Sequence, residues 1–412
     1  MKRSLVILLL TAFLTHAETL DELIRQTEKN NPAIATARQQ WEAARERIAV
    51  AGALPDPRLS YGYYLEEVQT KTGPQQQKAG FSQRFPMFGK RGLRTDAATH
   101  SAEELYARAL AVRANTLFQL QKNWFNLYYL GRSLETDRAR QTLFQTLEKT
   151  TETLVENGGD ARDLLELRIT LTQIEDHLRT LESKAEPLRA KLNALLNRDS
   201  NTPIAFPQTL PPSDLSSIAQ RATEERLSET ELQTAFHENN PAIEEQRAVL
   251  AREQARETLA KRNWLPDVTL GADWIQTGDG GNDPLIANLS INLPLWHSKN
   301  RAERLSAELE RAAQASRLQE QINRAQVLLT ASFSERNDAA RRETFYAAEL
   351  IPPAEQHFEL TRTAYENGSA DLRELTVSEE RLLNLRLILE RSRADRAVAH
   401  AEIEKWTGGP TP

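Results

Sequence analysis

The fold is decided by the stretch Leu285-Ile286-Ala287-Asn288-Leu289-Ser290-Ile291-Asn292-Leu293. From Ala287 onward apolar and polar residues alternate, which is the period-two pattern of a β-strand with one apolar and one polar face. A second alternating stretch, Val268–Trp274, comes before it, and the turn-rich segment 278–284 separates the two. This part of the chain therefore predicts a β-hairpin at about 267–294.

The first half of the chain repeats this design. Leu59–Leu65 and Ala79–Phe85 alternate in the same way around the turn-rich segment 70–77, which predicts a hairpin at about 57–86. Four landmarks also recur in one order: Asn30-Asn31-Pro32 returns as Asn239-Asn240-Pro241, Leu54-Pro55-Asp56 as Leu265-Pro266-Asp267, Phe85-Pro86 as Leu293-Pro294, and Glu156-Asn157-Gly158 as Glu366-Asn367-Gly368. Such an order indicates an internal duplication.

Long helices are expected between each hairpin and its Asn-Gly landmark. The segment 93–156 contains no proline. Its seam residues lie three and four positions apart, as in supercoiled helices: Leu117, Leu120, Trp124, Leu127, Gly131 and Leu134. We expect one helix over about 90–156 and its match over about 299–366, where Pro352-Pro353 predicts a kink or a break. A return helix should follow each tip, at 157–160 and 367–371, so that each copy holds a helical hairpin.

The expected organisation is a signal peptide at 1–17, a first repeat at 18–200, a connector at 201–230 and a second repeat at 231–409. The signal peptide is indicated by Lys2 and Arg3 before the apolar run Leu5–Leu14. The mature chain should begin near Glu18, outside the cytoplasm. Several prolines after Asn201 favour a plain linker over a small packed collar for the connector.

The composition excludes several functions. A net charge of −6 argues against nucleic acid as a partner, because phosphates are bound by clustered lysine and arginine. The chain has no cysteine, and its seven histidines and two methionines are scattered, so no metal site is predicted. No arrangement of a nucleophile with an acid and a base stands out. We therefore expect a protein that is not an enzyme and that needs no cofactor.

The strands are the expected membrane-inserting elements. No stretch after the signal peptide approaches the roughly 20 apolar residues of a membrane helix, whereas each strand is near the roughly 9 to 11 residues that cross a bilayer. Four strands alone would leave unpaired backbone groups in lipid, so two or three copies would have to share one barrel. Aromatic side chains at the hairpins predict an interfacial girdle, with the core of a soluble sheet as the alternative: Tyr61, Tyr63, Tyr64, Trp264, Trp274 and Trp296.

These motifs, in this order, resemble the TolC-like outer-membrane efflux proteins over nearly the whole mature chain. The resemblance implies a mainly α fold with a small β part: a homotrimer whose hairpins close a 12-stranded transmembrane β-barrel, continued into the periplasm by an α-helical barrel of coiled-coil helices. It also implies outer-membrane lipid around the barrel, a periplasmic adaptor (membrane fusion protein) and an inner-membrane pump of the RND type as partners. Phe85–Arg91 is most similar to the heavy-metal branch of the cobalt-zinc-cadmium type.

The helical tips are the expected sites of gating and docking. Acidic residues after each tip would form rings of carboxylates in a trimer and favour cations: Asp160, Asp163, Asp371 and Glu374. The family's constriction residue corresponds to Glu374, and the match of Asp163 is offset by one residue. The alternative is that these acids only complement helix N-termini. The predicted adaptor contacts, which could equally be mere helix terminators, are Asn157, Gly158, Gly159, Asn367 and Gly368.

The predicted function is a passive conduit that exports small solutes, with heavy-metal cations as one class of cargo. A periplasmic coiled-coil adaptor or scaffold is the first alternative, but it would need only one helical hairpin and would not explain two equivalent copies. A conduit for type I protein secretion is the second alternative, because it has the same shape.

Overall fold

The computed structural model describes residues 18–71, 73–156, 160–210, 236, 238–278, 280 and 282–407. The expected signal peptide, most of the connector and the first-copy tip residues Asn157, Gly158 and Gly159 lie outside these residues. The chain divides into two compact units. One contains residues 113–229 and 329–405 with the N-terminal segment to residue 32, and the other contains residues 33–112 and 230–328 with the C-terminal end.

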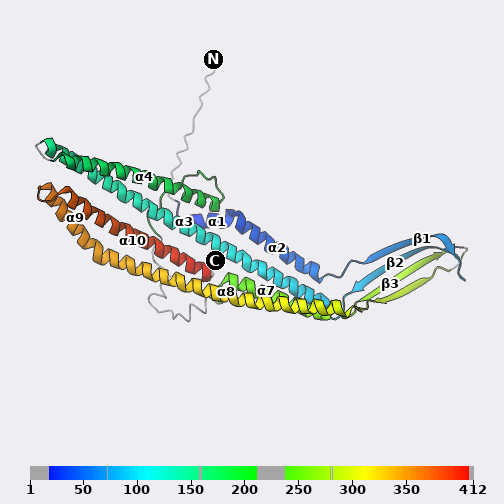
Figure 1. The fold of residues 1–412 in the computed structure, drawn as a ribbon. Helices are drawn as coiled ribbons and strands as arrows, with labels where there is room; N and C mark the ends of the chain where they lie inside the picture. Colours follow the sequence, from blue (N-terminus) through cyan, green and yellow to red (C-terminus); the bar gives the residue numbers. More distant parts are fainter. Residues whose placement is uncertain are drawn as a thin grey trace, which may run out of the picture. The chain divides into compact units, whose positions relative to one another are not determined.

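A single antiparallel sheet forms one part of the second unit (Figure 1). Its strands are β1 (Arg58–Val68), β2 (Gln75–Phe85), β3 (Val268–Thr277) and β4 (Leu285–Ile291), and they lie side by side in chain order. The hairpin of the first copy thus joins the hairpin of the second copy through the β2–β3 pair, in which Phe85 faces Val268 and Gln83 faces Leu270. Strands β1 and β4 are the two edges.

The alternation read in the sequence gives the sheet one apolar face. Cross-strand partners on this face include Leu59 with Phe81 and Leu270 with Leu289. The side chains are unusually open to solvent for their type, with Leu65 94% exposed and Leu289 66% exposed. The other face is polar, with Lys78 and Asp273 paired at 2.8 Å between Nζ and Oδ2. Because large apolar patches on a single chain normally find a partner, this face is built to be covered.

The helices of the second unit are α2 (Pro32–Gly52), α7 (Pro241–Arg262), and the first parts of α3 (Lys90–Glu156) and α8 (His297–Phe345). Asn240 caps α7, since its Oδ1 accepts the amides of Ala242 and Ile243. Arg252 of α7 pairs with Glu104 of α3 and with Glu253. Few large apolar side chains are buried in this unit, so charge pairs contribute much of the contact between α3 and α7.

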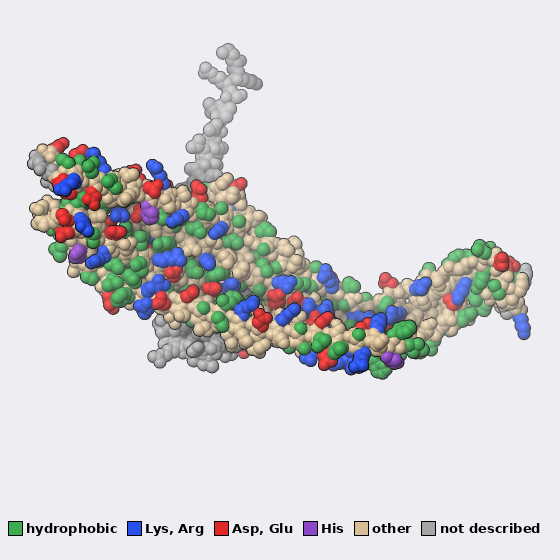
Figure 2. Space-filling model, in the orientation of Figure 1, with side chains coloured by type: hydrophobic (Ala, Val, Ile, Leu, Met, Phe, Trp, Pro, Cys, Tyr) green, Lys and Arg blue, Asp and Glu red, His purple; other side chains and the backbone are tan. Residues whose placement is uncertain are grey.

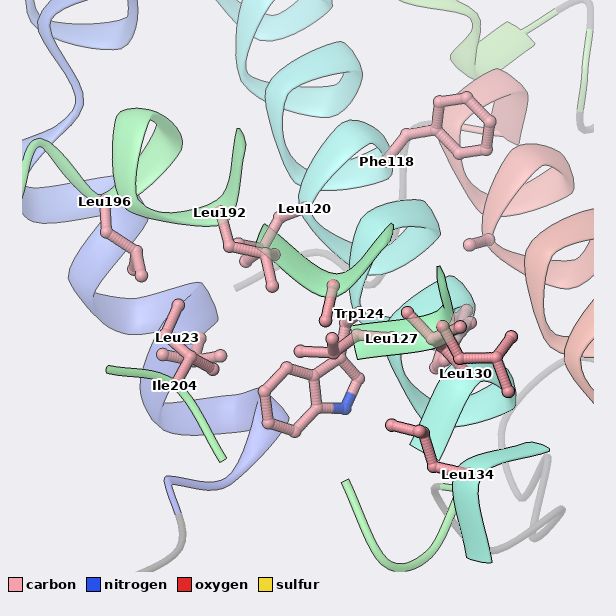
Figure 3. Close-up of a cluster of buried hydrophobic side chains, with 14 residues drawn as sticks. Leu23, Phe118, Leu120, Trp124, Leu127, Leu130, Leu134, Leu192, Leu196 and Ile204 are labelled. Carbon is pink, nitrogen blue, oxygen red and sulfur yellow. The ribbon is translucent and has the colours of Figure 1, made fainter. Parts of the chain in front are cut away.

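In the other unit, α1 (Leu20–Asn30) packs with the later part of α3, with α4 (Ala161–Leu196) and with α10 (Leu372–Thr407). The predicted seam on α3 is confirmed, because Leu120, Trp124, Leu127 and Leu134 are all buried there. Figure 3 shows these side chains converging with Leu192 and Leu196 of α4 and Leu23 of α1. The expected linker is not plain over its described residues, since Ile204, Phe206 and Leu210 join this core.

Gly131 shows why the seam needs a small residue. A Cβ at this position would lie 2.9 Å from the Cβ of Phe206, closer than real side chains approach. The guanidinium of Arg189 on α4 lies over that ring, 4.6 Å from its centroid. Phe206 is therefore held between α3 and α4, and this contact turns the start of the connector into a packed collar.

A second core lies toward the tips, where α3 and α4 meet α9 (Ile351–Glu366) and α10. Phe144 of α3 and Leu167 of α4 pack there with Phe358 and Leu375. The predicted kink at Pro352-Pro353 takes the form of a π-helical turn, Tyr346–Leu350, between α8 and α9. Pro352 and Pro353 have no backbone N–H to donate to the preceding turn, and the wider π-helical turn allows the helix to continue without these two hydrogen bonds. Among the described residues, no helix is long and apolar enough to cross a membrane.

Candidate functional site

The tip of the second copy is a compact hairpin end. Helix α9 ends at Glu366, and Gly368 adopts the left-handed conformation, with φ of 72°, which a glycine takes without strain. The amide of Gly368 donates to the carbonyl of Tyr365, and the amide of Ser369 to that of Ala364. Two of the orphan carbonyls of α9 are thereby satisfied, and Asn367 and Gly368 lie at an exposed turn.

Two of the tip acids cap helices. Asp371 Oδ1 accepts the amide of Glu374 at 2.7 Å at the start of α10, and Asp160 Oδ1 accepts the amide of Arg162 at 2.9 Å at the start of α4. Hydrogen bonds from the Arg162 side chain and amide lower the pKa of Asp160 to about 2. Asp160 is therefore ionised at neutral pH. Capping explains both residues, and their role in a gate stays a prediction.

The other two tip acids differ in their surroundings. Glu374 lies in the first turn of α10 with its side chain exposed. Asp163 is half-buried on α4, and its negative charge contributes to raising the pKa of Tyr365 on α9.

Sequence reasoning missed a contact between the two copies at this level. The hydroxyl groups of Thr151 on α3 and Tyr365 on α9 lie 2.8 Å apart and are buried. Burial raises the pKa of Tyr365, so its phenol stays protonated and can donate. A hydrogen bond between buried hydroxyls joins the first-copy helical hairpin to the second, just before their tips. No local pattern in the sequence marks these two residues, which lie 214 positions apart.

Further along the same helices lies a charged layer. Asp137 of α3 is buried against His177 of α4, with 2.6 Å between Oδ2 and Nδ1. Arg140 of α3 pairs with Glu379 of α10 at 3.1 Å, and burial raises the pKa of Glu379. These pairs connect α3 to α4 within the first helical hairpin, and to α10 of the second helical hairpin. They are polar contacts inside an otherwise apolar helix seam.

Three of the six predicted girdle residues lie on the apolar face of the sheet. Tyr61 and Tyr63 lie on the apolar face of the sheet and are two-thirds exposed, and Trp274 shares that face. Trp264 and Trp296 lie beyond the strand ends and are exposed. Tyr64 departs from this pattern, because alternation turns its side chain to the polar face, near Lys78. Figure 2 shows hydrophobic side chains gathered over the strands, at the right of the view.

The junction of the sheet with its helices is centred on Asp267, the last residue of the second Leu-Pro-Asp landmark. Its carboxylate accepts Lys90 Nζ at 2.8 Å and Arg84 Nη2 at 2.5 Å. Lys90 Nζ also donates to the carbonyl of Leu265 at 2.6 Å. Asp267 and Lys90 are both more than nine-tenths buried. Burial alone raises the pKa of Asp267, but the hydrogen bonds from Lys90 and Arg84 outweigh it and hold the pKa below its usual value.

The described residues place no three histidine or carboxylate side chains where they could hold a metal ion. The polar groups found here are caps, interhelical ties and a structural ion cluster.

Comparisons with known proteins agree with this geometry. Residues 233–409 match the sequence model of a family described as outer membrane efflux protein. No curated protein is significantly similar to the chain.

Solved structures match nearly the whole chain. The outer membrane protein VceC from Vibrio cholerae is 19% identical, with a TM-score of 0.78 and coverage of 95% of this chain and 96% of that one. CusC is 15% identical, with a TM-score of 0.80 and coverage of 95% and 92%. The open state of the outer membrane channel MtrE from Neisseria gonorrhoeae is 16% identical, with a TM-score of 0.74 and coverage of 95% and 89%.

The four-stranded sheet and the paired helical hairpins are the fold that the chain shares with these outer-membrane proteins. Residues 233–409 match the outer membrane efflux protein family in sequence, and the described chain shares the fold of these solved channels.

The ion cluster at the junction gives a first prediction. Asp267→Asn keeps the shape of the side chain but leaves Lys90 buried without its anion, which should cost about 3–5 kcal/mol of stability. Because the pKa of Asp267 is lowered in the folded chain, its contribution is present above the unfolded pKa of about 3.9 and is lost as pH falls further. Thermal unfolding followed by circular dichroism between pH 3 and 7 measures both effects. A variant as stable as the wild type at pH 7 would refute this role for the cluster, and Asp96→Asn, at an exposed carboxylate on α3, is the control.

Proposed function

We propose that three copies of the chain form the outer-membrane conduit of a tripartite efflux system. The observation that carries this proposal is the apolar sheet face, exposed on all four strands and bounded by two open edges. In lipid the apolar face would be covered, but the edges of β1 and β4 would leave unpaired amides and carbonyls. Joining edges between copies satisfies them, and three copies of four strands give 12, an even number within the range of known barrels.

The helical hairpins support the rest of the conduit. Each chain contributes two helical hairpins, α3–α4 and α9–α10, so three chains would place six helical hairpins around a tunnel. The turn at Asn367 and Gly368 is the surface we assign to the periplasmic adaptor, because a narrow exposed hairpin end can fit between the helices of another hairpin. An inner-membrane pump of the RND type would feed the conduit through that adaptor.

Assembly in the membrane tests this proposal directly. The full-length chain should fractionate with the outer membrane and migrate on a gel, without heating, as a trimer that heating converts to monomer. Recovery in the soluble periplasm as a monomer would instead favour the adaptor or scaffold alternative. The variant Leu289→Lys gives a second test, because a lysine on the apolar face costs up to about 2–4 kcal/mol in lipid and should reduce insertion without changing the helical content.

The tip contacts give a prediction about opening. Tyr365→Phe removes the hydroxyl from the buried pair with Thr151 and should weaken the tie between α3 and α9 by about 1–3 kcal/mol. If this tie holds the tips together, single-channel conductance in a planar bilayer should rise. Tyr346→Phe is the matched control, because Tyr346 packs in the same core and its hydroxyl has no hydrogen bond among the described residues. Equal conductance in all three proteins would exclude the tie as part of the gate.

The acids are tested in the same bilayer. Glu374→Gln removes one carboxylate per copy without removing a cap, so the preference for cations over anions should fall. Asp371→Asn keeps the cap and serves as the comparison, since asparagine is as good an N-cap as aspartate. An unchanged reversal potential in both variants would leave these acids as structural residues.

For the cargo, we propose small solutes, with heavy-metal cations as the class that Phe85–Arg91 favours through its resemblance to the heavy-metal branch. Deleting the gene should then increase sensitivity to zinc, cobalt or cadmium, and a plasmid copy should restore tolerance. Sensitivity to dyes alone would assign the conduit to drug efflux. Loss of a secreted polypeptide from the medium would favour type I secretion.

A further inference from the structure

The internal duplication places the Leu-Pro-Asp landmark in two very different environments. Asp267 is buried and accepts two cationic side chains. Asp56, its counterpart in the first copy, is exposed, and no ion pair or hydrogen bond to its carboxylate is found within the described part of the chain. Two copies of one motif that precede equivalent strands should serve equivalent junctions. The environment of Asp56 is therefore incomplete in a single chain.

The completed junction shows what is missing. Asp267 directly precedes β3, and its partner Lys90 follows β2, the antiparallel neighbour of β3. Asp56 lies in the same place before β1, but β1 is an edge strand and has no neighbour on its outer side. A strand that runs antiparallel to β1 and is followed by a cation would complete the site. In this chain, β4 is the strand that meets both conditions with an open edge.

Strand direction allows a second copy to supply it. The order β1-β2-β3-β4 is antiparallel throughout, so β4 runs opposite to β1, and β4 of one copy can pair with β1 of the next. The segment after β4 leads into α8, whose first turns carry Lys299 and Arg301. The Lys299 side chain is 69% exposed, and its ion pair with Glu303 is long, with 3.7 Å between Nζ and Oε1. Arg301 has no ion pair among the described residues and lines a cavity of about 170 Å³ beside Trp264.

The duplication also predicts the register in which β1 of one chain would pair with β4 of a neighbouring chain. Within the chain, Val268 faces Phe85 and Leu270 faces Gln83. The landmarks equate Asp267 with Asp56 and Phe85 with Leu293. Transferring the pairing therefore predicts three facing pairs between copies: Leu59 with Ile291, Tyr61 with Leu289, and Leu65 with Leu285.

An independent observation agrees with this register. All six of these side chains are exposed apolar or aromatic groups. Tyr61 shares a face with Ala79 and Trp274, and Trp274 in turn faces Leu285 across β3 and β4. A register shifted by one residue would instead set the apolar residues of one strand beside the polar residues of the other. The transferred pairing continues the apolar face across the boundary between copies.

We propose that Asp56 of one copy binds the cationic start of α8, at Lys299 and Arg301, in the next copy, as the intermolecular counterpart of the Asp267–Lys90 pair. The contact fixes the register of β1 against β4 between copies. The inference rests on the proposed function, because it requires copies that share one sheet. The partner is thus a second copy of this chain, bound through an edge strand and one charged clamp at its base.

Cysteine pairs test the register, and the chain contains no cysteine that would interfere. Tyr61→Cys combined with Leu289→Cys should give covalent trimers on oxidation of the detergent-purified protein. A bond within one chain is impossible, since β1 and β4 are three strand spacings apart, about 14 Å, beyond the reach of a disulfide. Tyr61→Cys with Leu285→Cys is the control on the same face, four residues out of register. Cross-linking of the control pair, but not of the first pair, would overturn the register.

Charge reversal tests the clamp. Asp56→Lys should leave the fold of the single chain unchanged but lower the temperature at which the trimer dissociates on a gel. Adding Lys299→Glu or Arg301→Glu to it should restore that temperature. Glu66→Lys, an equal change of charge near the other end of β1, should have no comparable effect. Failure of both second changes to rescue Asp56→Lys would overturn the clamp.

The same measurements separate this inference from the proposed function. A stable trimer with neither the cross-link nor the rescue would refute the clamp and leave the conduit intact. A wild-type chain that stays monomeric in detergent and in membranes would refute the conduit, and the inference with it.

Discussion

An apolar sheet face with two open edges is the constraint on which the rest of the structure depends. In water the apolar face of a single chain would stay exposed. In lipid that face would be covered, but the backbone amides and carbonyls of the edge strands would be unpaired. Further copies of the chain can satisfy face and edges together. Two long helices continue directly from these strands, since α3 follows β2 and α8 follows β4.

The ion cluster at Asp267 connects these two parts of the second unit. It joins the last residue before β3 to the first residue of α3, and so fixes how a strand from one repeat continues beside a helix from the other. Burying such a charge pair is not a cheap source of stability, since desolvation offsets much of the attraction. Its value is specificity: only one register of β2 against β3 brings Lys90 to Asp267.

Several elements could be predicted from the sequence because their signals are local. The strand pairs, the seam through Trp124 and Leu127, and the helix end at Gly368 follow from residue periodicity and backbone preference within a few positions. Other contacts gave no such signal. The sequence around Thr151 and Tyr365 is ordinary for a helix, and only the fold brings their hydroxyl groups together. Phe206 lies in a proline-rich segment that predicts a linker, and its packing depends on the space that Gly131 leaves for its ring.

The sequence by itself determined the class of fold, the duplication and the face of each strand, since periodicity depends only on neighbouring residues. Tertiary structure decided which carboxylates serve as caps, which charges are buried and which copy of a repeated motif lacks a partner. Asp56 and Asp267 stand in the same motif. Their difference arises because one precedes a central strand and the other an edge strand, a distinction that exists only once four strands lie side by side.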